Sequence, residues 1–284
     1  MISEAIDRIQ TVDLNSDFAY EELFFVFSQI KNQPYYSYKF QKDLNFCFYR
    51  SRKNDCFVNY FDFKDLSYPP ENKVLEYSRA NKPLQNLFYV SDKWTTNLME
   101  LKLFWAKNLL DNDIFWVTTG KWDLIEDLNV MIIPDFYNDS MKQLVDHISS
   151  DLEKAQIDYL KYINDIFKKH AIEDKNLYKL TSAFCNSILF SSVKNNQNID
   201  GVLFTSVLDG RGFNLALNPL TIDSKKIRLG SVVKHLLRKT TGSDNKPIID
   251  NMNTPIVADR LDYIKEKIIW DDKNYRQLIK AHTP

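Results

Sequence analysis

Apolar residues recur along this chain at two spacings, one typical of helices and one typical of strands. Near the N-terminus they stand three or four positions apart, which predicts a helix over about residues 17–31 with Asp17 as its N-cap. Residues 45–52 form a run rich in aromatic side chains and are expected to be a strand. Because side chains alternate along a strand, Tyr49 and Arg50 should point to opposite faces.

A second short apolar run, from Leu87 to Val90, predicts another strand. The helix that follows is expected to start at Ser91 or Asp92, since either side chain can cap the free N–H groups of a first turn. The loop before this strand contains Arg79, and the helix after it contains Glu100. A cation and a carboxylate are therefore expected on either side of one strand.

The middle of the chain alternates between strand and helix patterns. Residues 114–134 are expected to form two strands around a turn at Gly120-Lys121. Residues 139–171 have helical periodicity, but the apolar stripe changes phase near residues 149–151, so one long helix and two shorter helices both fit. Another helix is predicted over residues 180–192.

The last part of the chain has mainly strand patterns. Residues 199–207 are almost continuously apolar, which is typical of a strand buried on both faces in the interior of a sheet. Residues 210–212 contain two glycines and predict a loop, and residues 214–217 and 226–229 are expected to be further strands.

The alternation of these elements predicts a single domain of the α/β (α+β) class. No internal repeat and no long linker divides the 284 residues. We expect residues 1–45 to be a helical addition, residues 46–218 to form the core, with the helical segment 139–171 inserted in it, and residues 219–284 to be a C-terminal extension.

Composition excludes several classes of protein. The 37 basic residues balance the 38 acidic ones, so direct binding to nucleic acid is not expected. No apolar run approaches the roughly 20 residues that span a bilayer, and the N-terminus lacks the apolar segment of a signal peptide. The three cysteines have no metal-ligand spacing and are expected to be reduced. These features predict a cytoplasmic protein without a bound metal or a membrane segment.

The scarcity of glycine limits how a nucleotide could be bound. Only six glycines occur, and none forms a dinucleotide-binding or P-loop pattern. Those patterns bring backbone N–H groups close to phosphate, so here side chains would have to hold a phosphate-bearing ligand. A guanidinium such as that of Arg79 suits this role, because its fork of donors matches two phosphate oxygens.

Several sequence blocks, in this order, resemble those of the RES-domain family, which is named for an Arg, a Glu and a Ser. The blocks are Phe48-Tyr49-Arg50-Ser51-Arg52, Arg79-Ala80-Asn81, Tyr89 with Glu100, Asp200-Gly201 leading to Ser206, and Gly212-Phe213-Asn214-Leu215-Ala216-Leu217. The spacings from Arg79 to Tyr89 and from Tyr89 to Glu100 fit the family. Ser78 and Phe204 depart from it, because the family usually has Gly and Tyr there.

This resemblance implies a fold similar to ADP-ribosyltransferases and an activity that consumes NAD⁺. It implies two sets of site residues, one catalytic and one that binds the substrate, and Arg50 belongs to both. The catalytic residues are Glu100, Arg50 and Ser206, and the residues that bind the dinucleotide are Arg79, Arg50, Tyr49, Tyr89 and Asn81. NAD⁺ is then a substrate, and no prosthetic group is implied.

Three functions stay open at this point. The chain could cleave the nicotinamide–ribose bond with water or phosphate as acceptor, transfer ADP-ribose to a macromolecule, or only bind a ligand. Family members that are toxins also imply an antitoxin protein as a partner, and a homo-oligomer is a further expected assembly. Without the resemblance, Glu100 would be expected on a solvated helix face, Arg79 in an ion pair with Glu76, and Ser206 in a bond to the backbone.

Overall fold

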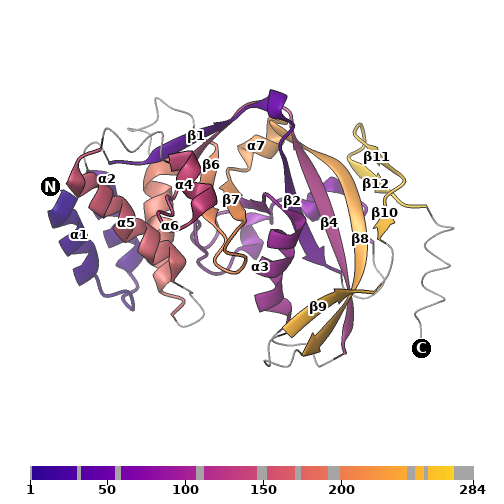
Figure 1. The fold of residues 1–284 in the computed structure, drawn as a ribbon, viewed down its shortest axis with the longest axis horizontal. Helices are drawn as coiled ribbons and strands as arrows, with labels where there is room; N and C mark the ends of the chain where they lie inside the picture. The colour runs from indigo at the N-terminus through magenta and orange to yellow at the C-terminus, as the bar shows by residue number, and fades with distance from the viewer. Residues whose placement is uncertain are drawn as a thin grey trace.

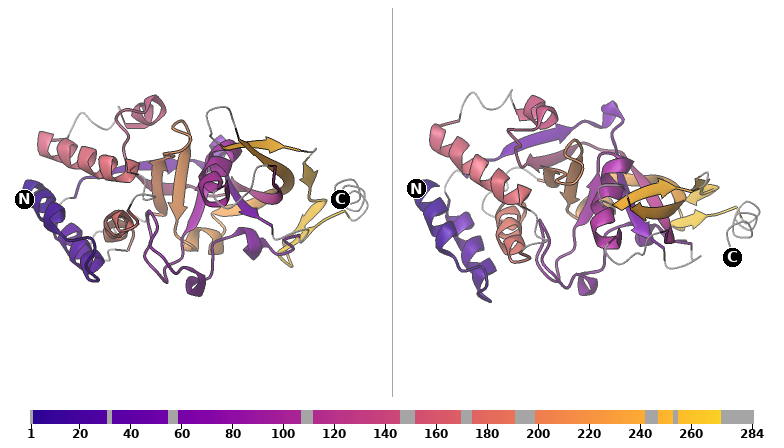
Figure 2. Two further views of the ribbon diagram at one scale, coloured as in Figure 1. Left: turned by 90° about the horizontal axis from the view of Figure 1, so that it is seen from below. Right: turned by 60° about the horizontal axis from the view of Figure 1, so that its bottom comes forward.

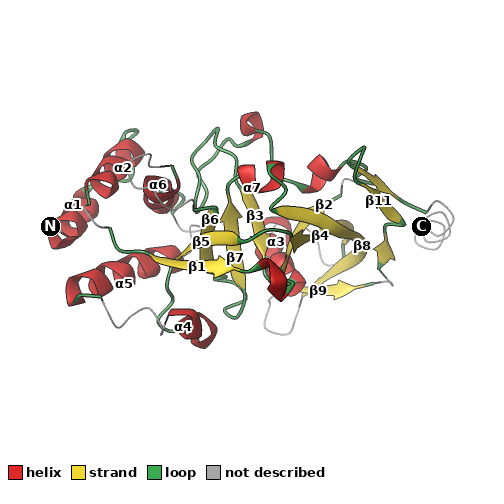
Figure 3. Ribbon diagram, turned by 90° about the horizontal axis from the view of Figure 1, so that it is seen from above, coloured by secondary structure: helices red, strands yellow, loops and turns green. Residues whose placement is uncertain are grey.

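We describe a computed structural model of the chain. The structure describes residues 2–30, 33–54, 59–106, 112–145, 152–169, 174–190, 199–241, 247–252 and 255–271. Strands, helices and loops are distinguished in Figure 3. The Asn-rich residues 194–198, at which a turn is expected after the predicted helix 180–192, lie outside the described residues, as do His147 and His170, for which no catalytic or metal-binding role is expected.

One large mixed sheet runs through the molecule. Its ten strands have the order β1-β5-β6-β7-β3-β2-β4-β8-β10, with β9 paired to β8. They are β1 (Tyr36–Phe40), β2 (Cys47–Lys53), β3 (Phe88–Ser91), β4 (Ile114–Leu124), β5 (Leu128–Ile132), β6 (Gly201–Thr205), β7 (Phe213–Leu217), β8 (Ile227–Thr241), β9 (Pro247–Asn251) and β10 (Ile256–Val257). The pair β5–β6 is parallel and the other described pairs are antiparallel. A second small sheet pairs β11 (Arg260–Asp262) with β12 (Lys267–Ile269).

Most of the described helices lie at one end of this sheet, the end near the N-terminus of the chain (Figure 1). They are α1 (Ile2–Thr11), α2 (Ala19–Gln29), α4 (Asp139–Val145), α5 (Lys154–Lys168) and α6 (Leu177–Leu189), whereas α3 (Trp94–Ala106) lies on the sheet and α7 (Leu220–Asp223) precedes β8. In both views of Figure 2, the N-terminal helices lie at one end of the molecule and the C-terminal strands at the other. Within the described ranges, no helix combines the length and apolar content that crossing a bilayer requires.

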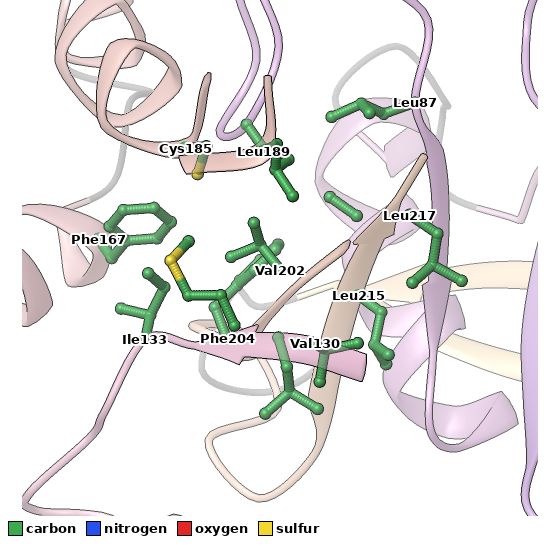
Figure 4. Close-up of a cluster of buried hydrophobic side chains, with 14 of the residues drawn as sticks. Leu87, Val130, Ile133, Phe167, Cys185, Leu189, Val202, Phe204, Leu215 and Leu217 are labelled. Carbon is green, nitrogen blue, oxygen red and sulfur yellow. The ribbon is translucent and has the colours of Figure 1, made fainter. Parts of the chain in front are cut away.

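The helices are joined to the sheet through one continuous apolar core. In Figure 4, Phe167 of α5 and the side chains Cys185 and Leu189 of α6 lie over Val202 and Phe204 of β6. All five side chains are buried. The periodic apolar faces predicted for these helices therefore pack on the strand that was predicted to be interior. That strand is interior, because β6 pairs with both β5 and β7.

The predicted turn at Gly120-Lys121 is wrong. β4 continues through both residues, with an irregularity between Lys121 and Trp122, and the chain turns only before β5. A Cβ on Gly120 would lie 2.9 Å from the Leu229 side chain and 3.0 Å from the Trp122 indole nitrogen. Gly120 is thus explained by close side-chain packing on a strand rather than by turn geometry.

Other boundaries also differ from the sequence expectations. The segment 139–171 is two helices, the second of the alternatives considered, since α4 and α5 are separate. The cap of α2 is Phe18 and makes no side-chain bond, so Asp17 is not the N-cap. Ser91 is the last residue of β3, so it does not cap α3. The strand expected over 226–229 continues to Thr241 as β8 and pairs with β4 along most of its length.

Candidate functional site

Glu100, on the second turn of α3, has one carboxylate oxygen fixed by two side chains. Ser206 donates its hydroxyl to Glu100 Oε1 at 2.6 Å, and Asn214 donates its amide to the same oxygen at 2.7 Å. Among the described residues, Oε2 has no hydrogen-bond partner. The carboxylate is half-buried, so one oxygen orients the group while the other is left for a ligand.

The two donors are themselves held in place. Asn214 accepts a hydrogen bond from the Ser91 hydroxyl at 2.7 Å, and Asn97 of α3 donates to the same hydroxyl at 3.3 Å. Hydrogen bonds between side chains therefore run from Asn97 of α3 to Ser91 of β3, on to Asn214 of β7, and back to Glu100 of α3. The side chains of Asn97, Ser91 and Asn214 are buried, and a buried polar network with fixed partners has one preferred geometry.

Ser206 lies directly after β6 and is fully buried. Its hydroxyl donates to Glu100 and accepts from the backbone N–H of Asp209 at 3.0 Å. The donor capacity of this hydroxyl is thus already used. Ser206 acts here by orienting the Glu100 carboxylate and the loop after β6, rather than by contacting a ligand with its own hydroxyl.

Strand pairing shows which side chains share the sheet face with this carboxylate. Ser91 lies opposite Tyr49 of β2 on one side and opposite Asn214 of β7 on the other. Asn214 in turn lies opposite Phe204 of β6. Residues directly opposed on antiparallel strands have their side chains on the same face. Tyr49, Ser91, Asn214 and Phe204 therefore lie on the face toward α3.

Arg79 reaches this same face from the loop before β3. Its guanidinium carbon lies 5.8 Å from the centre of the Phe204 ring and 5.9 Å from that of Tyr178. Its Nη1 donates to the carbonyl of Phe167 in the last turn of α5, where helix carbonyls lack an internal partner. A planar cation held over two rings and a helix end has a fixed orientation.

The ion pair considered for Arg79 in the sequence is not formed. Glu76 instead pairs with Lys175 at 2.9 Å, and both side chains are largely exposed. Phe204, which departs from the family pattern, is one of the two rings that contact Arg79. The guanidinium is thus held by aromatic rings and a carbonyl, with no carboxylate among its described contacts.

The loop that carries Arg79 is fixed by Tyr89. The Tyr89 hydroxyl donates to Asn81 Oδ1 at 2.8 Å and accepts from the Ala80 N–H at 3.1 Å. Ser78 also donates to Asn81 Oδ1, at 2.7 Å. Burial raises the pKa of the Tyr89 phenol, so it stays protonated as a donor. Tyr89 and Asn81 therefore shape the Arg79 loop, and the Ser78 hydroxyl contributes to this loop where the family usually has glycine.

Arg50 lies between strands rather than beside the carboxylate. Its Nη1 donates to the Tyr89 carbonyl at 2.7 Å, and its guanidinium carbon is 5.3 Å from the centre of the Phe88 ring. In the described sheet, β2 and β3 pair at a single position, so this bond joins them where they separate. Burial, together with the Arg52 charge, lowers the pKa of Arg50 to about 9. None of the described contacts joins Arg50 to Glu100.

Tyr49 is the remaining aromatic residue expected at the site. It lies on the face toward α3, and its hydroxyl is 3.6 Å from the Cys47 sulfur, which donates to it. This bond and burial raise the pKa of Tyr49 to about 12. The structure therefore places Tyr49 on the same sheet face as the Glu100 carboxylate, with a hydrogen-bond partner on its own strand.

The opposite side of the same strands contains a pocket of about 290 Å³. It is lined mostly by aromatic and aliphatic side chains, with one carboxylate, and it includes Tyr38, Phe40, Phe46, Cys47, Phe48, Asp92, Lys93, Leu203, Phe213 and Leu215. Burial raises the pKa of Asp92, whose Oδ1 accepts from the Phe213 N–H at 2.8 Å. Nowhere in the described part of the chain do three or more potential metal ligands cluster.

Sequence reasoning missed three polar residues of the site. Asn214, Ser91 and Asn97 orient Glu100, but none was expected to have a role in the chemistry. Asn214 was within reach of prediction, because it is the Asn of the Gly-x-Asn block. Ser91 and Asn97 give no signal in the sequence, since their role depends on how β3 and α3 pack.

We expect the substitution Asn214→Asp to shift the pH dependence of any activity that needs ionised Glu100. The new carboxylate would lie at the position of an amide 2.7 Å from Glu100 Oε1, and two carboxylates at that distance resist double ionisation. The pKa of the pair then rises, so the acid limb of the pH–rate profile should move up by about one unit or more. The profile of Asn72→Asp, a substitution at an exposed asparagine, should stay unchanged. An unshifted profile for Asn214→Asp would show that this amide does not control the carboxylate.

No family model and no curated protein matches this chain. The resemblance to RES-domain proteins therefore rests on the ordered sequence blocks.

Proposed function

We propose that this protein cleaves the nicotinamide–ribose bond of NAD⁺, with water or phosphate as the acceptor. The observation that carries the proposal is that Glu100 and Arg79, from separate elements, face the same side of the sheet, with Glu100 Oε1 fixed by two donors. A fixed carboxylate and a fixed guanidinium suit a ligand that has an anionic pyrophosphate and a ribose that becomes positive during reaction.

The carboxylate would act on the ribose. When the bond from C1 of the ribose to the nicotinamide nitrogen breaks, its electron pair leaves with nicotinamide, which becomes neutral. The ribose then has oxocarbenium character, and a nearby carboxylate stabilises this positive charge. Glu100 Oε2 can also accept a hydrogen bond from a ribose hydroxyl. An oxygen of water or phosphate forms the new bond to C1, and with water a proton is released.

The guanidinium would act on the pyrophosphate. Arg79 has one nitrogen bound to the Phe167 carbonyl, and its other donors are free to meet phosphate oxygens as far as the described contacts extend. Its position over the Phe204 ring, together with the bond to the Phe167 carbonyl, restricts the direction of those donors. Holding the dinucleotide at two points, the reacting ribose and the pyrophosphate, lowers the entropy cost of reaching the transition state.

Incubation of the purified chain with NAD⁺, with product identification by chromatography and mass spectrometry, tests this proposal. Release of nicotinamide together with ADP-ribose identifies water as acceptor, and a phosphorylated ADP-ribose formed only in phosphate buffer identifies phosphate. Label that moves from the adenine half of NAD⁺ to protein or nucleic acid would instead indicate a transferase. NAD⁺ that stays intact in every buffer would overturn the proposal.

The substitution Arg79→Lys is expected to raise KM for NAD⁺ more than it lowers kcat. An ammonium cannot provide both the guanidinium's contact with the Phe204 ring and its paired donors to phosphate. We therefore expect a loss of about tenfold in kcat/KM, mainly through weaker binding. Steady-state kinetics measure both constants. Lys265→Arg, at an exposed turn distant from the site, is the control for altered cation type. An equal fall in kcat with KM unchanged would contradict the binding role.

A further inference from the structure

Tyr137 is an exposed aromatic residue whose backbone N–H and whose ring each have a described partner. The residue is 77% exposed, and its backbone N–H donates to Asp135 Oδ1 at 3.0 Å. The Lys168 ammonium nitrogen lies 4.7 Å from the ring centre. One face of the ring thus has a cation above it, which leaves the other available to a ligand. An exposed ring with a fixed orientation is a surface on which a planar group can stack.

Lys168 is itself fixed by a buried carboxylate. Its ammonium group is 2.6 Å from Asp135 Oδ1, and the Asp135 side chain is only 5% exposed, whereas that of Lys168 is 38% exposed. Asp135 therefore orients both the backbone of Tyr137 and the cation on its ring. Because this carboxylate balances the Lys168 charge, the cation supplies hydrogen-bond donors and ring contact more than net positive charge.

Two tethers connect this pair to the two ends of the candidate site. On one side, Asn138 donates to the Gly210 carbonyl at 2.7 Å, and Gly210 belongs to the loop that begins at Ser206, the donor to Glu100. On the other side, Phe167, the residue before Lys168, accepts the hydrogen bond from Arg79. Tyr137 and Lys168 thus adjoin both the residue expected at the ribose and the residue expected at the pyrophosphate.

The part of NAD⁺ that still lacks a partner is the adenosine half. Adenine is planar and stacks on aromatic side chains, and such stacking is typically worth about 1–3 kcal/mol per base. The adjoining ribose and phosphate offer acceptors to an ammonium group. We infer that Tyr137 and Lys168 form the subsite for the adenosine half of NAD⁺, an inference that rests on the proposed function.

A comparison of two ligands tests this inference. Nicotinamide mononucleotide contains the reacting ribose but lacks the adenosine half, so only NAD⁺ should depend on the subsite. In the Glu100→Gln background, which prevents turnover, Tyr137→Ser is expected to weaken NAD⁺ binding about tenfold by calorimetry and to leave binding of the mononucleotide unchanged. Tyr137→Phe keeps the ring and should retain the affinity of the parent.

Tyr263 supplies a matched control. It is also exposed and has a cation over its ring, with the Arg228 guanidinium carbon at 4.9 Å. It directly follows β11, which Figure 3 shows at the end of the molecule away from α4. Tyr263→Ser should leave the binding of both ligands unchanged. Equal affinity of Tyr137→Ser and its parent for NAD⁺, or equal weakening of both ligands, would overturn the adenosine subsite.

The outcomes separate this inference from the proposed function. Cleavage of NAD⁺ by the wild-type chain with no effect of Tyr137→Ser would leave the function standing and remove the subsite. Loss of NAD⁺ binding in Tyr137→Ser, with no cleavage by the wild-type chain, would retain the subsite and remove the function. If neither ligand binds the Glu100→Gln parent and the wild-type chain leaves NAD⁺ intact, both the subsite and the function are overturned.

Discussion

Replacing Glu100 by glutamine is expected to lower kcat for nicotinamide release from NAD⁺ about 10²–10³-fold, the usual cost of losing one preorganised electrostatic contact. Glutamine retains an oxygen that can accept the bonds from Ser206 and Asn214, both of which now go to Glu100 Oε1. The local geometry should therefore persist, while the negative charge facing the ribose is lost. Steady-state nicotinamide release, measured by chromatography, gives the change in kcat.

The control for this substitution is Glu126→Gln. Glu126 is exposed in the turn between β4 and β5, and its described hydrogen bond is from its backbone N–H to the Lys226 carbonyl. Its charge is lost in the same way, so a general effect of net charge would appear in both variants. An unchanged rate in Glu100→Gln would leave any activity standing but refute Glu100 as the residue that stabilises the transition state.

Replacing Phe184 by alanine is expected to lower the free energy of unfolding by about 3–5 kcal/mol, the range for removing a buried aromatic ring. Phe184 of α6 is 1% exposed, and its ring centre lies 5.4 Å from that of Phe27 in α2 and 6.2 Å from that of Phe167 in α5. One ring therefore connects the N-terminal helices to the inserted ones. Urea denaturation followed by circular dichroism measures the change.

Phe25→Ala is the matched control, because Phe25 lies in α2, the helix that Phe184 contacts through Phe27, but is 55% exposed. Its effect should stay within about 0.5 kcal/mol, as for most surface substitutions. Phe184→Ala should affect the helices and the sheet together. A separate early transition confined to helical signal, with the sheet unaffected, would show that the N-terminal and inserted helices form an independent unit instead of packing as additions to the core.

The sequence was most informative where periodicity and burial agree. The apolar patterns of α2, α6 and β6 predicted both element type and the strand at the interior of the sheet, because these residues need a buried face in any fold. β1 was missed, since its Tyr-Ser-Tyr-Lys-Phe sequence carries both polar and aromatic residues on an edge strand. The turn predicted at Gly120 was wrong because glycine is favoured both in turns and where side chains pack closely against a strand.

Some contacts of the candidate site could be predicted from the sequence, and others could not. The contact between Ser206 and Glu100, 106 residues apart, agrees with the expectation that they lie together. The role of Arg50 could not be foreseen, because its bond to the Tyr89 carbonyl depends on where β2 and β3 diverge. Asn97 and Ser91 likewise depend on how α3 lies on the sheet. Spacing in sequence predicts which groups are present, whereas tertiary packing decides which of them face each other.

A crystal structure of the Glu100→Gln variant with NAD⁺ bound tests whether the dinucleotide lies between Glu100 and Arg79. The sheet has two faces on which a ligand could lie, the face toward α3 and the aromatic pocket of about 290 Å³ on the opposite face. We expect the nicotinamide ribose beside residue 100 and the pyrophosphate within hydrogen-bond distance of Arg79, both on the face toward α3. A dinucleotide bound in the aromatic pocket, or elsewhere with Arg79 still bonded only to the Phe167 carbonyl, would contradict the account.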